Sequence, residues 1–233
     1  MPMRRRAAYA AAAISVFAPI GLISACAPKD ASREAGAPQS AAPVATDAPA
    51  GAYKLDKSHA SLVFKVDHIG YSQYTGQFKS FDAALVFDPV APEKMSVSAT
   101  IDVGSLDIPS PPEGFLDELK SPLWLNAVEF PTMTFRSTRA TLTGADTARI
   151  DGELSFRGVS APVAIDATFN GGYAGFPPYD PNARVGFSAR GALKRSLFGV
   201  VIGVPTAESP VGVGDDVTFE IEAEFSGPPA PAQ

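Results

Sequence analysis

Few side chains in this 233-residue sequence could carry out chemistry, and their spacing assembles no catalytic site. The only histidines are His59 and His68, and the only cysteine is Cys26. A metal centre would need carboxylates to complete it, and no spacing matches a zinc or EF-hand site. Ser58 or Ser61 could join a triad on paper, but no nucleophile-elbow motif accompanies them. We therefore expect no catalytic residue, no metal ion and no enzymatic activity.

The N-terminal segment is typical of an exported lipoprotein. Arg4 to Arg6 precede an uncharged run that ends at Ala25, as in a signal peptide. Residues 23–26 are Ile-Ser-Ala-Cys, which resembles a lipobox, so we expect residues 1–25 to be removed and Cys26 to be lipidated. An ordinary cleaved signal peptide or a retained anchor is the alternative. This predicts a periplasmic protein held to a membrane by its lipid, and Ala27 after the cysteine favours the outer membrane.

Composition divides the mature chain into a tether, one domain and a tail. Residues 26–51 have almost no large apolar side chain, which predicts a disordered tether behind the lipidated cysteine. Residues 52–227 fit one domain, and residues 228–233 form a second disordered end. Removing residues 1–25 leaves 16 basic and 25 acidic side chains, a net charge of −9. Such a surface repels nucleic acid and anionic head groups, so only the acyl chains should attach the protein to a membrane.

Within the domain, apolar and polar residues alternate with period two, which predicts about eight strands and almost no helix. Strands with one apolar face must stack as two sheets or close into an antiparallel barrel, and a barrel of this size holds side chains or one small ligand. Between Pro109 and Val128 the spacing becomes helical at Phe115, Leu116 and Leu119, which predicts a short helix that closes one mouth. Residues 170–183 and 199–215 are candidate rim loops.

Several motifs together resemble a YceI-like domain. They are residues 53–64 (YKLDKSHASLVF), 68–70 (HIG), 76–78 (GQF), 123–126 (LWLN), 130–137 (FPTMTFRS), 152–159 (GELSFRGV) and 194–199 (KRSLFG). The match covers the predicted domain in order. The resemblance implies a lipocalin-like antiparallel β-barrel that binds an isoprenoid lipid, such as a polyprenyl pyrophosphate or a quinone tail, in an internal tunnel. Some relatives are fused to cytochrome b561 domains, which suggests quinone traffic, and a homodimer is also among the implications.

The resemblance implies a tunnel lined by inward-facing residues, although the same residues by themselves would equally suit a solid core. The expected lining is Leu62, Phe64, Val66, Phe81, Leu85, Phe87, Ile101, Trp124, Phe135, Phe156, Phe187 and Phe219. The small residues Ala83, Ala99, Ala167, Ala189 and Gly191 share the inward parity and would leave room along the axis.

Two polar residues continue the inward parity at strand ends. We expect His68 and Arg195 to contact the head group or a quinone carbonyl, because both side chains donate hydrogen bonds. The alternative is a histidine satisfied by backbone and an arginine paired with Asp215 or Asp216.

Residues 113–119 carry acids where many members of the family have basic residues or histidine, which favours a neutral quinone over a pyrophosphate. Two functions are consistent with these sequence features. The first is binding, sequestration or transport of an isoprenoid lipid in the cell envelope. The second is an envelope interaction or stress-related lipoprotein with a filled barrel, which binds a partner through the rim aromatics Tyr173, Phe176 and Tyr179.

Overall fold

Alternating side chains form strands over most of residues 44–229, the part of the chain that the computed structural model describes. The elements are β1 (Gly51–His68), β2 (Ser72–Phe78), β3 (Phe81–Phe87), η1 (Pro92–Lys94), β4 (Ser96–Asp102), η2 (Val103–Ser105), β5 (Leu106–Asp107), α1 (Phe115–Lys120), β6 (Thr132–Leu142), β7 (Thr147–Phe156), β8 (Val159–Tyr173), β9 (Asn182–Lys194), η3 (Arg195–Phe198) and β10 (Val213–Pro229). Cys26, the expected signal peptide and most of the expected tether lie outside the described residues. Among residues 44–229, no helix is long and apolar enough to span a bilayer.

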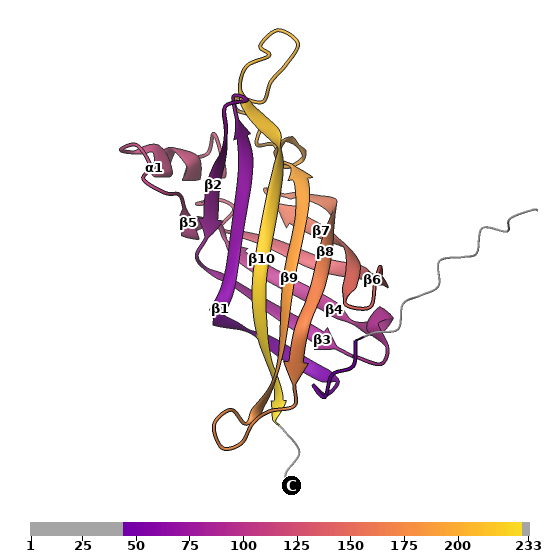
Figure 1. Ribbon diagram of the computed structural model, residues 1–233. Helices are drawn as coiled ribbons and strands as arrows, with labels where there is room; N and C mark the ends of the chain where they lie inside the picture. Colours follow the sequence, from indigo (N-terminus) through magenta and orange to yellow (C-terminus); the bar gives the residue numbers. More distant parts are fainter. Residues whose placement is uncertain (1–43, 230–233) are drawn as a thin grey trace, which may run out of the picture. The chain divides into compact units, whose positions relative to one another are not determined.

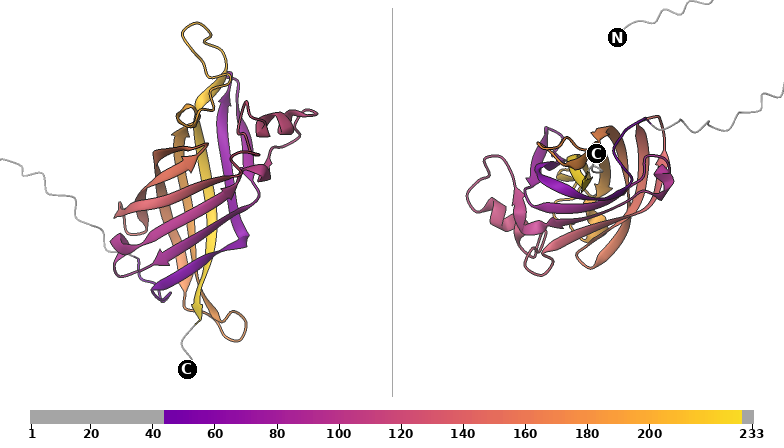
Figure 2. Two further views of the ribbon diagram at one scale, coloured as in Figure 1. Left: turned by 180° about the vertical axis from the view of Figure 1, so that it is seen from behind. Right: turned by 90° about the horizontal axis from the view of Figure 1, so that it is seen from below.

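Eight of the strands close an antiparallel barrel (Figure 1). Around the barrel the order is β1, β10, β9, β8, β7, β6, β4 and β3, which returns to β1. Closure depends on β1, whose residues 51–54 pair with β3 on one edge while β10 pairs along the other edge. Figure 2 shows the ring of strands from behind and from below. The predicted all-β barrel of about eight strands with one short helix is confirmed.

Two further strands, β2 and β5, were not predicted from the sequence. β1 changes partners along its length, since residues 63–68 pair with β2, and β2 in turn pairs with β5. The change of partner coincides with a bulge, because Leu55 pairs with Phe225 whereas Ala60 already pairs with Ala223. β2 has the sequence SQYTGQF, which lacks a regular apolar face, and β5 has only two residues, so neither produced a periodic signal.

The axis of the barrel stays open partly because aromatic rings lie over glycines of neighbouring strands. Phe219 of β10 is paired with Gly191 of β9, and a Cβ added to that glycine would overlap the Phe219 ring. The same relation joins Phe64 of β1 to Gly76 of β2. A ring seated on a glycine lies along the wall instead of crossing the lumen, so glycine here makes space by allowing close approach.

Residues 44–50 lie against one end of the barrel, which corrects the expectation of a disordered tether through residue 51. The Val44 N–H donates to the Ala145 carbonyl at 2.9 Å, and the Thr46 hydroxyl donates to the Gly172 carbonyl at 3.1 Å. Ala48 is only 2% exposed. The prediction of disorder was wrong for residues 44–50 because it considered only large apolar side chains. A small residue also packs well where two backbones approach closely, as Ala48 does near Gly172.

Candidate ligand-binding site

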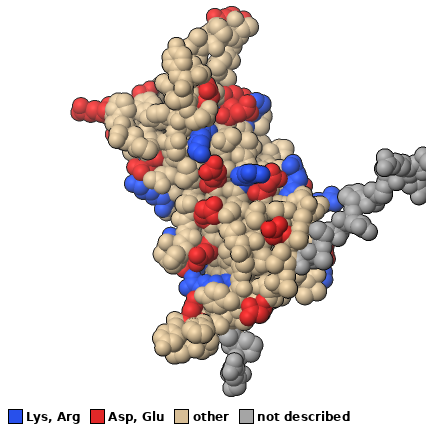
Figure 3. Space-filling model, viewed as in Figure 1, with Lys and Arg blue, Asp and Glu red and all other residues tan. Residues whose placement is uncertain are grey.

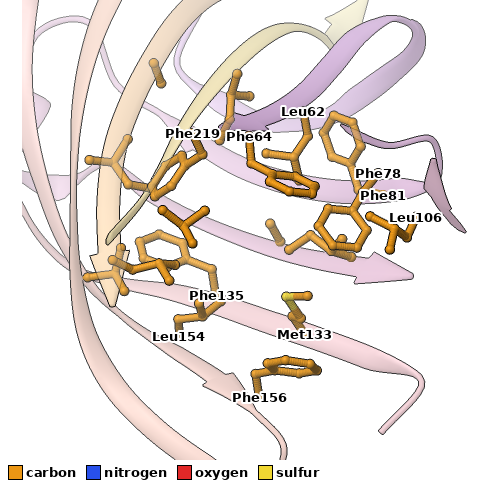
Figure 4. A pocket seen from close by; sticks show the side chains of 18 of the residues that line it. Leu62, Phe64, Phe78, Phe81, Leu106, Met133, Phe135, Leu154, Phe156 and Phe219 are labelled. Atoms are coloured by element: carbon orange, nitrogen blue, oxygen red, sulfur yellow. The ribbon is translucent and has the colours of Figure 1, made fainter. Parts of the chain in front are cut away.

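An apolar cavity of about 840 Å³ lies inside the barrel. All eight barrel strands contribute inward-facing side chains to its wall. Figure 4 shows Leu62, Phe64 and Phe81 on one side of this space and Phe135, Leu154 and Phe156 on another, with Met133 between. Small-molecule sites commonly occupy about 300–1,000 Å³, so the volume suits one ligand.

Eleven of the twelve residues expected to line a tunnel border this cavity. They are Leu62, Phe64, Val66, Phe81, Leu85, Ile101, Trp124, Phe135, Phe156, Phe187 and Phe219. The exception is Phe87, which is 3% exposed and borders a smaller pocket beside residues 44–46. Ala83, Ala99, Ala167 and Ala189 also border the main cavity, whereas Gly191 is covered by the Phe219 ring. Contact of these residues with a ligand stays a prediction.

Sequence reasoning missed part of the lining. Val97, Met133, Leu154, Val163 and Ile165 also border the cavity. They share the inward parity of the strands, so the alternation could have identified them. Leu106 and Ile108 border it as well, but they belong to β5 and the segment after it, where no alternation was present.

One end of the cavity is bordered by α1 and β2. Phe115 and Leu119 of α1 line the cavity, and the Phe115 ring contacts Tyr74 of β2 edge-on, with 6.3 Å between centroids. His68, at the end of β1, lines the same region, and its ring centroid lies 5.9 Å from that of Tyr74. His68 is exposed, and its ring makes no hydrogen bond within residues 44–229. The geometry therefore leaves His68 available to a polar group that enters this mouth.

Acidic side chains surround the same mouth. Glu113, Asp117 and Glu118 are exposed at or beside α1. Figure 3 shows acidic side chains at the α1 end of the molecule, whereas both signs mix along the strands. The apolar face of α1 thus points to the cavity while its acids remain in solvent.

Arg195, the second expected head-group contact, borders the cavity, and its guanidinium is bonded to the backbone. It is 7% exposed, and its guanidinium donates to four carbonyls, those of Gly214 (2.8 Å), Val213 (2.8 Å), Val200 (2.9 Å) and Ile202 (2.8 Å). Burial lowers the pKa of Arg195. The alternative, a hydrogen-bonded pair with Asp215 or Asp216, is not formed, because Asp215 accepts from Ser196 and Asp216 from Lys194. Arg195 therefore holds the segment between β9 and β10 in place.

Trp124 and Arg195 lie side by side in the cavity wall. The Arg195 guanidinium carbon is 5.7 Å from the centroid of the indole, within the range of a cation–π contact. Trp124 lines the cavity, and its Nε1 is buried without a hydrogen-bond partner among the described residues. An unsatisfied buried donor costs about 1–3 kcal/mol, so an acceptor that reached it would stabilise the protein.

A separate polar cluster lies at the β1 bulge. The Asp56 Oδ2 and His59 Nδ1 atoms are 3.1 Å apart, and Nδ1 is 3.9 Å from Glu224 Oε2, so each residue could offer one atom to a metal ion. Hydrogen bonds from Ser58, Arg184 and His59 hold the pKa of Asp56 well below its usual range. The Arg184 charge already compensates Asp56 and would repel a cation. We therefore interpret the cluster as a set of polar contacts that stabilises the β1 bulge.

The loop aromatics remain solvent-exposed. Phe176 and Tyr179 are 64% and 84% exposed, and their rings stack with centroids 5.8 Å apart. Tyr173 belongs to β8 instead of the loop, and its hydroxyl donates to Asp180 at 2.7 Å. These residues lie at the opposite end of the strands from α1.

A closed antiparallel barrel around one apolar cavity, with a short helix at its mouth, defines a lipocalin-like protein. The chain belongs to the YceI-like domain family, which matches residues 53–225, as the motifs predicted. It is 37% identical over 158 residues to a UPF0312 protein of Azotobacter vinelandii, covering 67% of this chain and 80% of that protein. It is 35% identical over 164 residues to Protein YceI of Salmonella arizonae, covering 70% of this chain and 83% of that protein.

Solved structures share the fold. BcnA of Burkholderia cenocepacia superposes with a TM-score of 0.62 at 24% identity, covering 73% of this chain and 98% of that one. A polyisoprenoid binding domain from Saccharophagus degradans, implicated in plant cell wall breakdown, gives a TM-score of 0.55 at 12% identity, covering 76% of this chain and 99% of that one. At these identities the likeness establishes the architecture alone.

Proposed function

We propose that this protein binds an isoprenoid lipid, without catalysis, in the bacterial cell envelope. The observation that carries the proposal is the apolar cavity of about 840 Å³. Since an apolar cavity of about 150 Å³ holds one benzene, this one has room for roughly 30 carbon atoms, a chain more than a single ring. Each buried methylene contributes about 0.8 kcal/mol, so a tail of this size supplies on the order of 10 kcal/mol or more before ordering costs.

Membership of the YceI-like family and the shared architecture of the polyisoprenoid binding domain from Saccharophagus degradans support this ligand class. The alternative function, an interaction protein with a filled barrel, fits a cavity of this volume poorly. It retains one supporting observation, the exposed stack of Phe176 and Tyr179.

The head group that suits this mouth is neutral. The acids beside α1 would repel a pyrophosphate, and the guanidinium of Arg195 is already occupied by four carbonyls. His68 and Tyr74 offer hydrogen-bonding side chains at the mouth, which a quinone carbonyl or a prenol hydroxyl could use. We therefore favour a quinone or polyprenol over a polyprenyl pyrophosphate.

Attachment to the membrane is part of the proposal and rests on the sequence of the N-terminal segment. Lipidation of Cys26 would keep the barrel beside the bilayer from which its ligand comes, and Ala27 favours the periplasmic face of the outer membrane. Intact-mass spectrometry of the unaltered protein should show cleavage before Cys26 and the mass of a diacylglyceryl group, and Cys26→Ser should show neither. A cleaved, unaltered protein without that added mass would refute the lipid anchor.

The decisive test is lipid extraction and native mass spectrometry of protein purified from its own membranes. Ala83→Phe adds a ring that projects into the cavity, whereas Ala84→Phe adds the same ring to the exposed face of β3. We expect an isoprenoid bound to the unaltered protein and to Ala84→Phe, and at least a tenfold lower occupancy in Ala83→Phe. A wild-type protein that carries no lipid, or equal occupancy in the two variants, would contradict the proposal.

A further inference from the structure

Beyond the main cavity lies a second apolar space of about 80 Å³, next to residues 44–46. The residues that border both spaces are Met95, Ala140, Ile150, Ala167 and Phe187. The two spaces are therefore neighbours, separated by a thin layer of side chains. Phe187 has the largest side chain in this layer.

Other aromatic rings hold Phe187 in position. Its centroid lies 5.4 Å from that of Phe169, 6.4 Å from Phe87 and 6.2 Å from Phe225. The register pairs it directly with Phe169 on β8. A ring packed against three others has little freedom to turn aside, so it acts as a fixed partition and not as a flexible gate.

The chain itself closes the space beyond the partition. Val44 and Thr46 border the small pocket, and their hydrogen bonds to Ala145 and Gly172 fix this segment across the strand ends. A lipid tail that enters at the α1 end thus meets Phe187 first and the N-terminal segment behind it.

We propose that Phe187 sets the longest isoprenoid chain that the barrel accepts. This inference rests on the proposed function and adds the determinant of chain length to it. Removal of the ring would join the two spaces. An apolar space of about 150 Å³ holds six carbons, so 80 Å³ together with the volume of the ring should admit about one more isoprene unit.

The test offers the full-length protein an equimolar mixture of polyprenols of graded length and weighs the bound species by native mass spectrometry. Phe187→Ala should shift the most abundant bound chain upward by about one isoprene unit. The matched control is Phe130→Ala. Phe130 packs against the buried core cluster that contains Phe156, but it borders neither of the two spaces. The control removes an identical ring from the core and should leave the preferred length unchanged.

Two further variants keep the proposal falsifiable if Phe187→Ala does not fold. Phe187→Leu is a milder truncation and should shift the distribution in the same direction. Ala167→Phe adds a ring to the same layer and should shorten the preferred chain. Unchanged lengths in all folded variants, or an equal shift in Phe130→Ala, would overturn the role of Phe187 while leaving lipid binding intact. A wild-type protein that binds none of the polyprenols would instead overturn the proposed function.

Discussion

Replacement of Arg195 by Met tests whether this residue stabilises the fold or binds the head group of the lipid. Met preserves much of the alkyl stem and removes every donor. Four carbonyls lose a partner, and only the bond to Val200 is fully buried, while the other three are partly accessible to water. With about 2 kcal/mol for the buried bond and somewhat less than 1 for each of the others, we expect a loss of about 4 kcal/mol. That is a large part of the roughly 5–15 kcal/mol that stabilises a typical protein.

Urea unfolding of the unaltered protein, Arg195→Met and Arg195→Lys measures this loss, with equal slopes in urea as the check that only stability has changed. Arg195→Lys should fall between the other two, because an ammonium can still donate to some of the carbonyls. Amide hydrogen exchange should accelerate in residues 199–212, which the guanidinium holds. Once folded, Arg195→Met should retain its lipid. A stability change below about 1 kcal/mol combined with loss of the lipid would refute this reasoning and return Arg195 to the head-group site.

The remaining predictions concern the β1 bulge and the packing of the Phe219 ring on Gly191. The pKa of Asp56 is lowered in the folded protein, so its contribution is complete above about pH 4 and is lost as the pH falls through the folded value. Asp56→Asn should therefore cost about 1–2 kcal/mol at pH 7, with a smaller difference from the unaltered protein in urea unfolding at pH 3. Gly191→Ala should displace the Phe219 ring into the lumen, since the added Cβ also meets the Ala164 carbonyl oxygen at 2.7 Å. We expect the free energy of unfolding to fall by about 1–3 kcal/mol and less lipid to be bound. If neither value changed, the position of the ring would not depend on the glycine.

Period-two alternation was sufficient to predict the strands of the barrel and most of its lining. A side chain's inward or outward position depends only on its parity within a strand, so Phe64 and Phe135 could be placed before any pairing was known. Phe87 shows the limit of that logic. It has the correct parity, but parity does not tell how far along the axis a residue lies, and Phe87 lies in the closed end.

Features that depend on pairing between distant segments could not be predicted. The Phe219 ring packs on Gly191 only because the register of β9 and β10 pairs these two residues. Arg195 follows the inward parity of β9. Its hydrogen-bond partners are carbonyls of residues that lie 5 to 19 positions later in the sequence. Backbone acceptors have no signature in the sequence, because every residue carries one.

The distribution of the core explains how a barrel can be both hollow and stable. One buried cluster, which includes Tyr53, Phe87 and Phe225, lies at the strand ends near residues 44–50. A second cluster, which includes Val103 and Phe198, lies at the other ends. Large side chains thus pack at both ends of the strands, and the middle of the wall contains alanines such as Ala83 and Ala99, which pair across β3 and β4. Because Ala83 borders the cavity, a ring added there can occupy the lumen at a small cost in stability, so the loss of lipid in that variant would report on the cavity and not on unfolding.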